Sequence, residues 1–375
     1  MKFSLRFKWL IMMGVFPAFV WGCSNSDKEK DEVLPPPVVD NKPETDPESK
    51  PEEKVWYSNP VIDSDNPDPT VIKADDGYFY LYATGGNTWI HKSKDLVKWE
   101  FVSGAYEEDK KPNWESDAGI WAPDINYING KYVMYYSLSK WGGTSTCGIG
   151  VSVSDTPAGP FTDHGKLFRS NEIGVTNSID PFYIEDNGRK FIFWGSWYGI
   201  WGVELSEDGL SLKGGLTDAK QNKFKIAATY NGSTEGYEGS YILKRGNYYY
   251  LFCSTGTCCE GANSTYQTLV SRSESLFGPY VNKMGENITD NPSIGKPKRP
   301  ESLILKNSAF LGTGHNSEIV QDDKGQDWII YHAYRTVDPD KGRVVLLDRV
   351  YWDSKDWPYL MKNSASVRAE APVFK

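Results

Sequence analysis

Short runs of aromatic and β-branched residues alternate with polar turns from about Trp56 to the end of the chain. Five runs share this character, and each follows a turn that contains glycine with Asp, Asn, Arg or Lys. They are residues 78–82, 132–136, 190–194, 248–252 and 328–331. Such runs are typical of β-strands, and a polar turn ahead of a run is typical of a hairpin. The pattern therefore predicts an all-β fold built from hairpins.

An acidic or polar residue stands at the start of the short strand before each of these hairpins: Asp68, Asp124, Asp180, Glu238 and His315. The intervals between them are 56, 56, 58 and 77 residues. A near-constant period with one hairpin per unit is the mark of a repeat architecture, and units of this length form the blades of a β-propeller. The sequence predicts a five-bladed β-propeller over residues 56–375.

Three of these positions carry acids that the fold alone does not explain. The first strand of each propeller blade lines the central channel, so Asp68, Asp180 and Glu238 are expected to converge. Clustered carboxylates repel one another and raise each other's pKa, which favours a use in acid–base chemistry. We expect Asp124, in an Ala-Pro-Asp sequence, to bond neighbouring backbone instead.

The first 22 residues have the features of an export signal. Lys2, Arg6 and Lys8 precede an apolar stretch, residues 9–21, which is too short to span a bilayer. Gly22-Cys23 resembles a bacterial lipobox, so Cys23 is predicted to carry a lipid. An ordinary signal peptide with a coincidental cysteine is the alternative. We expect an exported lipoprotein on the outer membrane or cell surface, with the periplasmic face as the alternative location.

Residues 23–55 are almost wholly polar or proline, so they cannot bury enough apolar surface to fold. We interpret them as a disordered tether. Four cysteines remain after the predicted processing, in an oxidising compartment where disulfides persist. Cys258 and Cys259 are adjacent and either form a bridge or remain thiols, and the sequence does not choose between these states. Cys147 and Cys253 are the other two.

Composition narrows the class of ligand. The formal net charge of −9 argues against a protein that tracks nucleic-acid phosphates. The aromatic content is 14%, with 14 Trp and 23 Tyr, and flat rings stack on the C–H faces of sugars. We expect a carbohydrate substrate, no nucleic-acid partner, no organic cofactor and a monomeric protein.

Six motifs occur in order at this blade spacing: Asn66-Pro67-Asp68-Pro69, Trp121-Ala122-Pro123-Asp124, Ser178-Ile179-Asp180-Pro181, Tyr237-Glu238-Gly239-Ser240, Gly314-His315-Asn316-Ser317 and Asp356-Trp357-Pro358. Together they resemble the motif set of glycoside hydrolase family 43, over roughly residues 57–360. The resemblance implies a five-bladed propeller and an inverting mechanism. It matches Asp68 to the general base, Glu238 to the general acid and Asp180 to the carboxylate that orients the acid and tunes its pKa.

The same resemblance suggests further site residues. Trp121 matches a sugar-stacking position, with a core tryptophan as the alternative. Asn177 and Ser196 match polar substrate contacts, and Trp197 is either part of a sugar platform or blade packing. His315 is implied to face a calcium ion held largely through waters, because calcium prefers oxygen ligands. A structural histidine is the alternative.

The segment after Glu238, from Gly256 to Tyr280, looks most like arabinanases. We expect an endo-acting hydrolase of α-1,5-linked arabinan, since the chain leaves no room for an appended β-sandwich domain. Two alternatives remain, another specificity of the family (α-L-arabinofuranosidase or β-xylosidase) and a surface glycan-binding propeller without catalysis. Residues 282–309 are expected to form a long loop, which would obstruct a subsite and cause exo action if it reached the channel.

Overall fold

The computed structural model describes residues 54–227, 236–289 and 298–375. The predicted signal peptide, the predicted lipid-bearing Cys23 and the tether up to residue 53 lie outside these residues. Within the described ranges, no helix is long and apolar enough to cross a membrane.

The described chain is all-β, as the sequence predicts, and its first three sheets are four-stranded and antiparallel with the strands in chain order. The first sheet contains β2 (Thr70–Lys73), β3 (Phe79–Ala83), β4 (Trp89–Ser93) and β5 (Glu100–Gly104). The second contains β6 (Gly119–Ile128), β7 (Lys131–Ser139), β8 (Gly148–Ser154) and β9 (Thr162–Arg169). The third contains β10 (Phe182–Asp186), β11 (Arg189–Trp194), β12 (Ile200–Glu204) and β13 (Phe224–Ala227).

The remaining hairpins belong to one nine-stranded sheet made of two parts. The first part contains β14 (Glu238–Arg245), β15 (Tyr248–Thr255), β16 (Gln267–Ser273) and β17 (Glu301–Ile304). The second contains β18 (Phe310–Gly314), β19 (Ile319–Gln321), β20 (Asp327–Arg335), β21 (Val344–Trp352) and β22 (Pro358–Tyr359). A single parallel residue pair, Gln267 with Thr313, joins the two parts.

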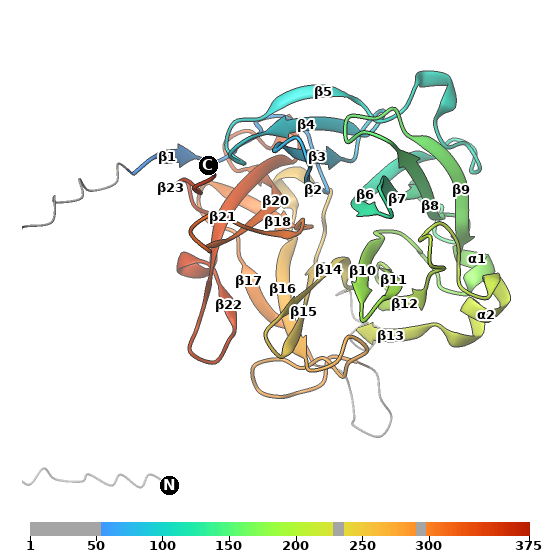
Figure 1. Cartoon of the computed structure of the whole chain (residues 1–375). Helices are drawn as coiled ribbons and strands as arrows, with labels where there is room; N and C mark the ends of the chain where they lie inside the picture. Colours follow the sequence, from blue (N-terminus) through green and yellow to red (C-terminus); the bar gives the residue numbers. More distant parts are fainter. Residues whose placement is uncertain (1–53, 228–235, 290–297) are drawn as a thin grey trace, which may run out of the picture. The chain divides into compact units, whose positions relative to one another are not determined.

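Helical structure is minor. The described residues include the short helices α1 (Ser170–Ile173) and α2 (Gly215–Asn222) and four 3-10 turns, η1 (Glu108–Lys110), η2 (Gly261–Asn263), η3 (Pro339–Lys341) and η4 (Met361–Asn363). Figure 1 shows the sheets following one another around a common centre, with β2, β6, β10 and β14 on the inner side.

Two details differ from the sequence-based expectation. Residues 282–309 do not form one long loop, because β17 lies within them and pairs with β16, which gives that sheet its outer strand. Leu303 and Ile304 explain the pairing, since both are fully buried in the core. Asp124 does not open a strand but lies inside the ten-residue β6, where the register with β7 shifts between Trp121 and Asp124.

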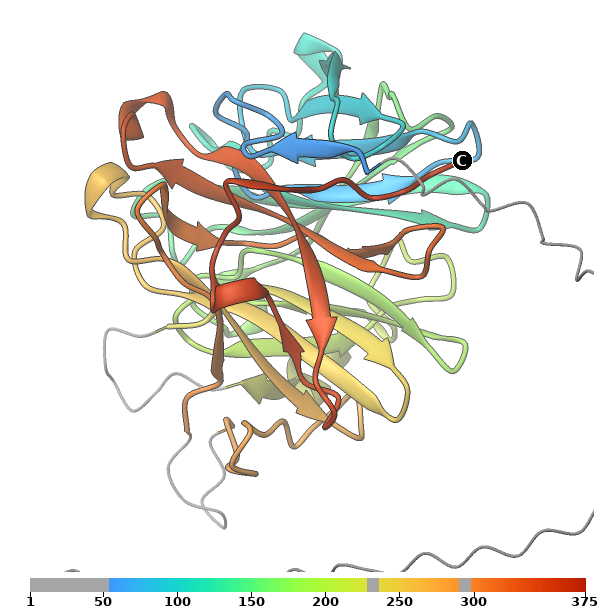
Figure 2. The ribbon, with the colours of Figure 1, turned by 90° about the vertical axis from the view of Figure 1, so that its left-hand side faces the viewer.

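The two ends of the described chain are paired. Strand β1 (Trp56–Ser58) runs antiparallel to β23 (Arg368–Glu370), beside the C-terminus (Figures 1 and 2). The Asn59 side chain donates to the Leu347 carbonyl at 2.9 Å and accepts from the Leu347 N–H at 2.9 Å. The start of the folded part is thereby attached to β21, in the last sheet.

A hydrogen bond also links each group of strands to the opening of the next. In the first four pairs, a side chain on or just after the second strand of one group bonds a residue on or next to the first strand of the following group. In the fifth pair, a side chain on β20 bonds Asp68, just before β2. The pairs are Thr84 with Ala122, Ser137 with Asp180, Ser196 with Glu238, Ser254 with His315, and His332 with Asp68. The last pair connects the final strands to the first sheet. These bonds fix the backbone that carries the site.

Candidate active site

A cavity of about 510 Å³ collects all eight residues that the sequence predicts in or near the site. They are Asp68, Trp121, Asn177, Asp180, Ser196, Trp197, Glu238 and His315. They come from loops and strand starts of all the sheets around the centre. The convergence expected from the spacing is therefore present in the structure.

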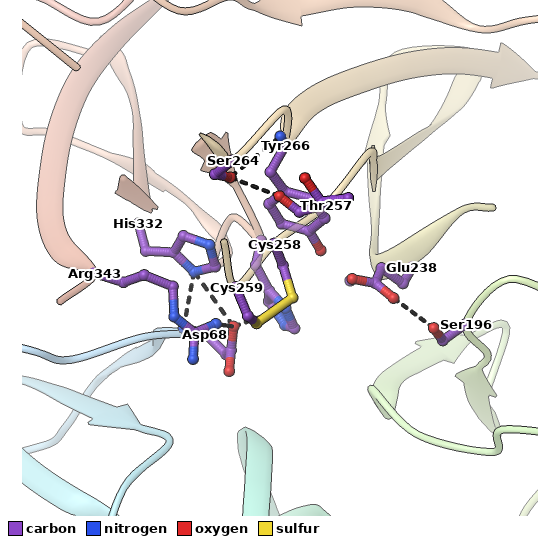
Figure 3. Close-up of a disulfide and its surroundings, with 12 residues drawn as sticks. Asp68, Ser196, Glu238, Thr257, Cys258, Cys259, Ser264, Tyr266, His332 and Arg343 are labelled. Carbon is purple, nitrogen blue, oxygen red and sulfur yellow. Dashed lines mark hydrogen bonds and ion pairs between the residues drawn. A yellow bond between two sulfur atoms is a disulfide. The ribbon is translucent and has the colours of Figure 1, made fainter. Parts of the chain in front are cut away.

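Asp68 lies at the centre of a group of cationic and imidazole side chains (Figure 3). Its Oδ1 atom is 3.0 Å from Nη1 of Arg343, 3.3 Å from Nδ1 of His315 and 3.3 Å from Nδ1 of His332. Burial alone would raise the pKa of Asp68, but Arg343 and then the two histidines lower it well below its usual range. Asp68 is therefore an ionised carboxylate at neutral pH.

Neither imidazole carries a charge at neutral pH. Burial lowers the pKa of His315 and lowers that of His332 to about 4. The backbone N–H of Asp68 donates to Nδ1 of His332 at 3.1 Å, so this ring positions the carboxylate as well as contacting it. Arg343 is then the permanent positive charge beside Asp68.

Glu238 and Asp180 have the opposite character to Asp68. Burial raises the pKa of both carboxyl groups, and repulsion from Glu238 raises that of Asp180 further. Ser196 and Tyr266 hydrogen-bond Glu238 and partly offset this rise, while the N–H of Gly239 donates to Asp180 at 3.0 Å. The pocket therefore contains one ionised carboxylate, Asp68, and two carboxyl groups, Asp180 and Glu238, that retain a proton more readily.

Five of the eight site residues have backbone angles that L-amino acids rarely adopt. The φ angles are +54° at Asp68, +56° at Asn177, +59° at Asp180, +62° at Trp197 and +50° at His315. Conformations of this kind cost about 1–3 kcal/mol each and persist where the surroundings impose them. At Asp68, Asp180 and His315, the N–H donates to a side chain from a neighbouring group of strands, at 3.1, 2.8 and 2.8 Å. The fold therefore maintains strained backbone at the pocket.

The predicted sugar-contacting residues surround these acids. Trp121 is half-buried on β6, and its ring lies 5.6 Å from that of Trp141, which is exposed and also lines the pocket. Trp197 is 49% exposed, so it is available to a ligand rather than packed in the core. Ser196 and Asn177 are buried, and the N–H of Asn177 donates to the Thr144 carbonyl at 2.7 Å.

The described side chains do not form a set of direct ligands for calcium. Within the described ranges, no group of three or more His, Cys, Asp or Glu side chains could hold a metal ion. His315 offers a single imidazole, and Arg343 already occupies the adjacent face of Asp68. A dication beside His315 would depend on water for its ligands, and calcium at this position stays a prediction.

The structure resolves the cysteine alternative. Cys258 and Cys259 form a disulfide, and both line the pocket. Cys147 and Cys253 are buried free thiols.

Asp124 lies outside the pocket lining, and it accepts the backbone N–H of Tyr183 at 2.8 Å, as expected from its sequence context.

Sequence reasoning missed Arg343, His332 and Tyr266. Arg343 follows Lys341-Gly342, which has the appearance of a solvated turn, and His332 lies within the apolar run of β20. Tyr266 is one aromatic residue among many. Only their position in three dimensions distinguishes them.

Comparison with known proteins identifies the family. Residues 57–358 match Glycosyl hydrolases family 43. The chain belongs to this family. One family 43 relative, the extracellular exo-alpha-(1->5)-L-arabinofuranosidase ArbA of Cellvibrio japonicus, is 32% identical over 78% of this chain and 85% of its own length. The extracellular endo-alpha-(1->5)-L-arabinanase 1 of Bacillus subtilis is 30% identical over 78% of this chain and 86% of its own length.

Solved family 43 structures also resemble the chain. The alpha-L-arabinanase of Cellvibrio cellulosa complexed with arabinohexaose has 30% sequence identity and a TM-score of 0.69, and the match covers 80% of this chain and 96% of that one.

Proposed function

We propose that this chain is an exported, inverting glycoside hydrolase that cleaves α-1,5-linked arabinan within the chain. The observation that carries the proposal is that one pocket contains carboxyl groups whose pKa values are shifted in opposite directions. Asp68 has a lowered pKa, and Glu238 and Asp180 have raised ones. Names of relatives support the substrate, because both the exo and the endo enzyme act on (1->5)-linked arabinose units.

Inverting hydrolysis needs two carboxyl groups with different protonation states on opposite faces of the sugar. In our proposal Asp68 is the general base: as a carboxylate it accepts a proton from a water that attacks the anomeric carbon. Glu238 is the general acid: it donates its proton to the departing glycosidic oxygen. Asp180 accepts the Gly239 N–H at 3.0 Å, next to Glu238, and in our proposal it orients the acid.

We further propose that the strands form a five-bladed β-propeller. Three four-stranded sheets account for three blades, and the two parts of the nine-stranded sheet account for the other two. The five successive hydrogen-bond links, the last of which runs from His332 back to Asp68, support a closed ring of five units.

Endo action is favoured by the open lining of the pocket. None of the described residues from 282 to 309 lines it, so this part of the predicted obstruction is absent from the cavity wall. Exo action is the second candidate, because the Cellvibrio japonicus relative is an exo enzyme. Linear arabinan should lose viscosity early and yield mixed oligosaccharides. Release of arabinose or one short oligomer alone, with viscosity preserved, contradicts endo action.

The mechanism is tested with three variants, Asp68→Asn, Asp180→Asn and Glu238→Gln. Each should fold, judged by an unchanged circular dichroism spectrum, and each should lose on the order of 10²-fold or more in kcat. Proton NMR of the first product should show the inverted anomer. Retention of configuration contradicts the inverting mechanism, and near-full activity of one variant removes that residue from its role. A folded parent that binds arabinan without cleaving it would instead indicate a glycan-binding protein.

A further inference from the structure

The Cys258–Cys259 disulfide occupies an unusual place, because it forms part of the wall of the catalytic pocket. Both residues line the cavity together with Asp68, Glu238 and Arg343. Cys258 is partly exposed and Cys259 is exposed. In the view of Figure 3 the two sulfur atoms are seen between the side chains of Asp68 and Glu238, and all four residues line the same cavity. A sugar placed between the proposed base and acid would therefore meet this disulfide.

The loop that carries the disulfide is held to itself by hydrogen bonds. Thr257 and Thr265 pair across it, with N–H to Oγ1 distances of 3.0 and 3.1 Å in the two directions. Ser264 donates to the Thr257 carbonyl at 2.6 Å. Gly256 permits this closure, since its φ is +97° and a Cβ there would lie 2.6 Å from the Thr265 carbonyl oxygen. The disulfide is thus presented in a fixed position.

A bridge between adjacent cysteines closes a small ring in which neither sulfur atom carries a hydrogen to donate. Its two sulfur atoms give a compact, polarisable and apolar surface. Ligand pockets combine such surfaces, which exclude water and make dispersion contacts, with a few polar groups that fix orientation. A furanose ring is smaller than a pyranose ring, so its C–H surface suits a narrow contact better than a broad aromatic plane.

We propose that the Cys258–Cys259 disulfide is a substrate-contacting group of this enzyme, against which the C–H face of an arabinofuranose unit packs. The proposal rests on the proposed function. Its chemistry requires the oxidised form. Reduction opens the ring to two thiols, frees rotation about both side chains and removes the fixed surface. The disulfide therefore contributes to substrate affinity and acts before the bond-breaking step.

Two independent changes test this role on linear arabinan. The first is reduction of the parent with dithiothreitol, which supplies two electrons and two protons per bridge, with thiol counts verified by a chromogenic reagent. The second is the Cys258→Ala/Cys259→Ala double variant. In both, KM should rise about 3- to 10-fold with kcat within two-fold of the oxidised parent, as expected for a lost apolar contact. The double variant is also the control for the reductant, because dithiothreitol should not change its KM.

Melting temperatures separate substrate contact from simple loop stabilisation. A disulfide that only stabilises the loop would lower the melting temperature on reduction and leave KM unchanged at temperatures where the protein is folded. An unchanged KM in a verified reduced parent that remains active on arabinan overturns the disulfide proposal and leaves the proposed function intact. A folded oxidised parent with no activity on arabinan overturns the proposed function, and with it the sugar assigned to the disulfide.

Discussion

Arg343 is the residue on which the charge balance of the pocket most depends. Its guanidinium is the one permanent cation within 4 Å of Asp68 among the described side chains, since both neighbouring imidazoles are neutral at neutral pH. It also lowers the pKa of Glu238 and Asp180. A single side chain thus acts on all three proposed acids, although nothing in its local sequence indicates this.

Replacing Arg343 with alanine should move both limbs of the pH profile of kcat/KM to higher pH. The acidic limb should move by about one unit or more, because loss of an adjacent cation raises a carboxyl pKa by that amount. Asp68 acts while ionised, so a raised pKa makes activity disappear at a higher pH on acidification. Arg335→Ala is the matched control, since it removes the Arg335–Asp63 ion pair outside the pocket. A parental profile for Arg343→Ala would contradict this role.

His315 carries the calcium expectation, which the structure does not test. If a water-held ion balances charge at the pocket, chelation should lower the activity or melting temperature of the parent. His315→Ala should lower activity and blunt that sensitivity. Activity assays and thermal scans with and without a chelator, followed by added calcium, measure both. A parent indifferent to chelation together with an active variant would identify His315 as a packing residue.

At the scale of elements, the buried Asp124 on β6 and the half-buried Glu318 before β19 form a pair that connects four groups of strands. The two carboxyl groups hydrogen-bond each other. Asp124 also accepts from the Tyr183 N–H at 2.8 Å, and Glu318 accepts from the Val71 N–H at 2.9 Å. Burial and then Glu318 raise the pKa of Asp124 well above its usual value, so Asp124 holds the shared proton.

This pair makes stability fall as pH rises. Because the folded pKa of Asp124 is raised, its contribution is fully present below the unfolded pKa near 4 and is lost as pH rises through the folded pKa. Asp124→Asn supplies a permanent N–H donor to Glu318 and should flatten this decline. At high pH it should raise the melting temperature relative to the parent by on the order of a few degrees.

Asp186→Asn serves as the control of opposite sign. Burial would raise the pKa of Asp186, but hydrogen bonds from Lys244 and Tyr249 lower it overall. Its contribution is therefore present above about pH 4 and lost on acidification, so this variant should be destabilised mainly at neutral and alkaline pH. Thermal scans across pH measure both slopes. An Asp124→Asn variant with the slope of the parent contradicts the shared proton.

The elements were largely predictable because period-two runs and polar turns are local signals. The runs at 78–82 and 248–252 correspond to β3 and β15 to within three residues at each end. Their spacing also predicted that Asp68, Asp180 and Glu238 meet. Strand β17 was missed because its pairing with β16 follows a long interruption. The environment of Asp68 was missed because His332 and Arg343 lie more than 260 residues away in the sequence.

At the scale of the whole molecule, the remaining prediction concerns where in the cell the protein is found. We propose that the protein is exported, which agrees with the extracellular relatives, and that Cys23 carries a lipid anchor. Cys23→Ser should therefore move the enzyme from the membrane fraction to the soluble fraction without changing kcat. Fractionation followed by activity assay measures this. A variant that sediments like the parent shows that the anchor lies elsewhere.

The pairing of β1 with β23 has a consequence for how the chain folds. Asn59 bonds Leu347 across 288 residues of sequence, and the Asp68 N–H bonds His332 across 264. Contacts this distant are slow to form, because the chain must lose the entropy of a very long loop before they stabilise it. The first sheet cannot acquire its final neighbours until the last strands have been synthesised. If the protein is exported, as proposed above, these closing contacts form only after the last strands have crossed the membrane.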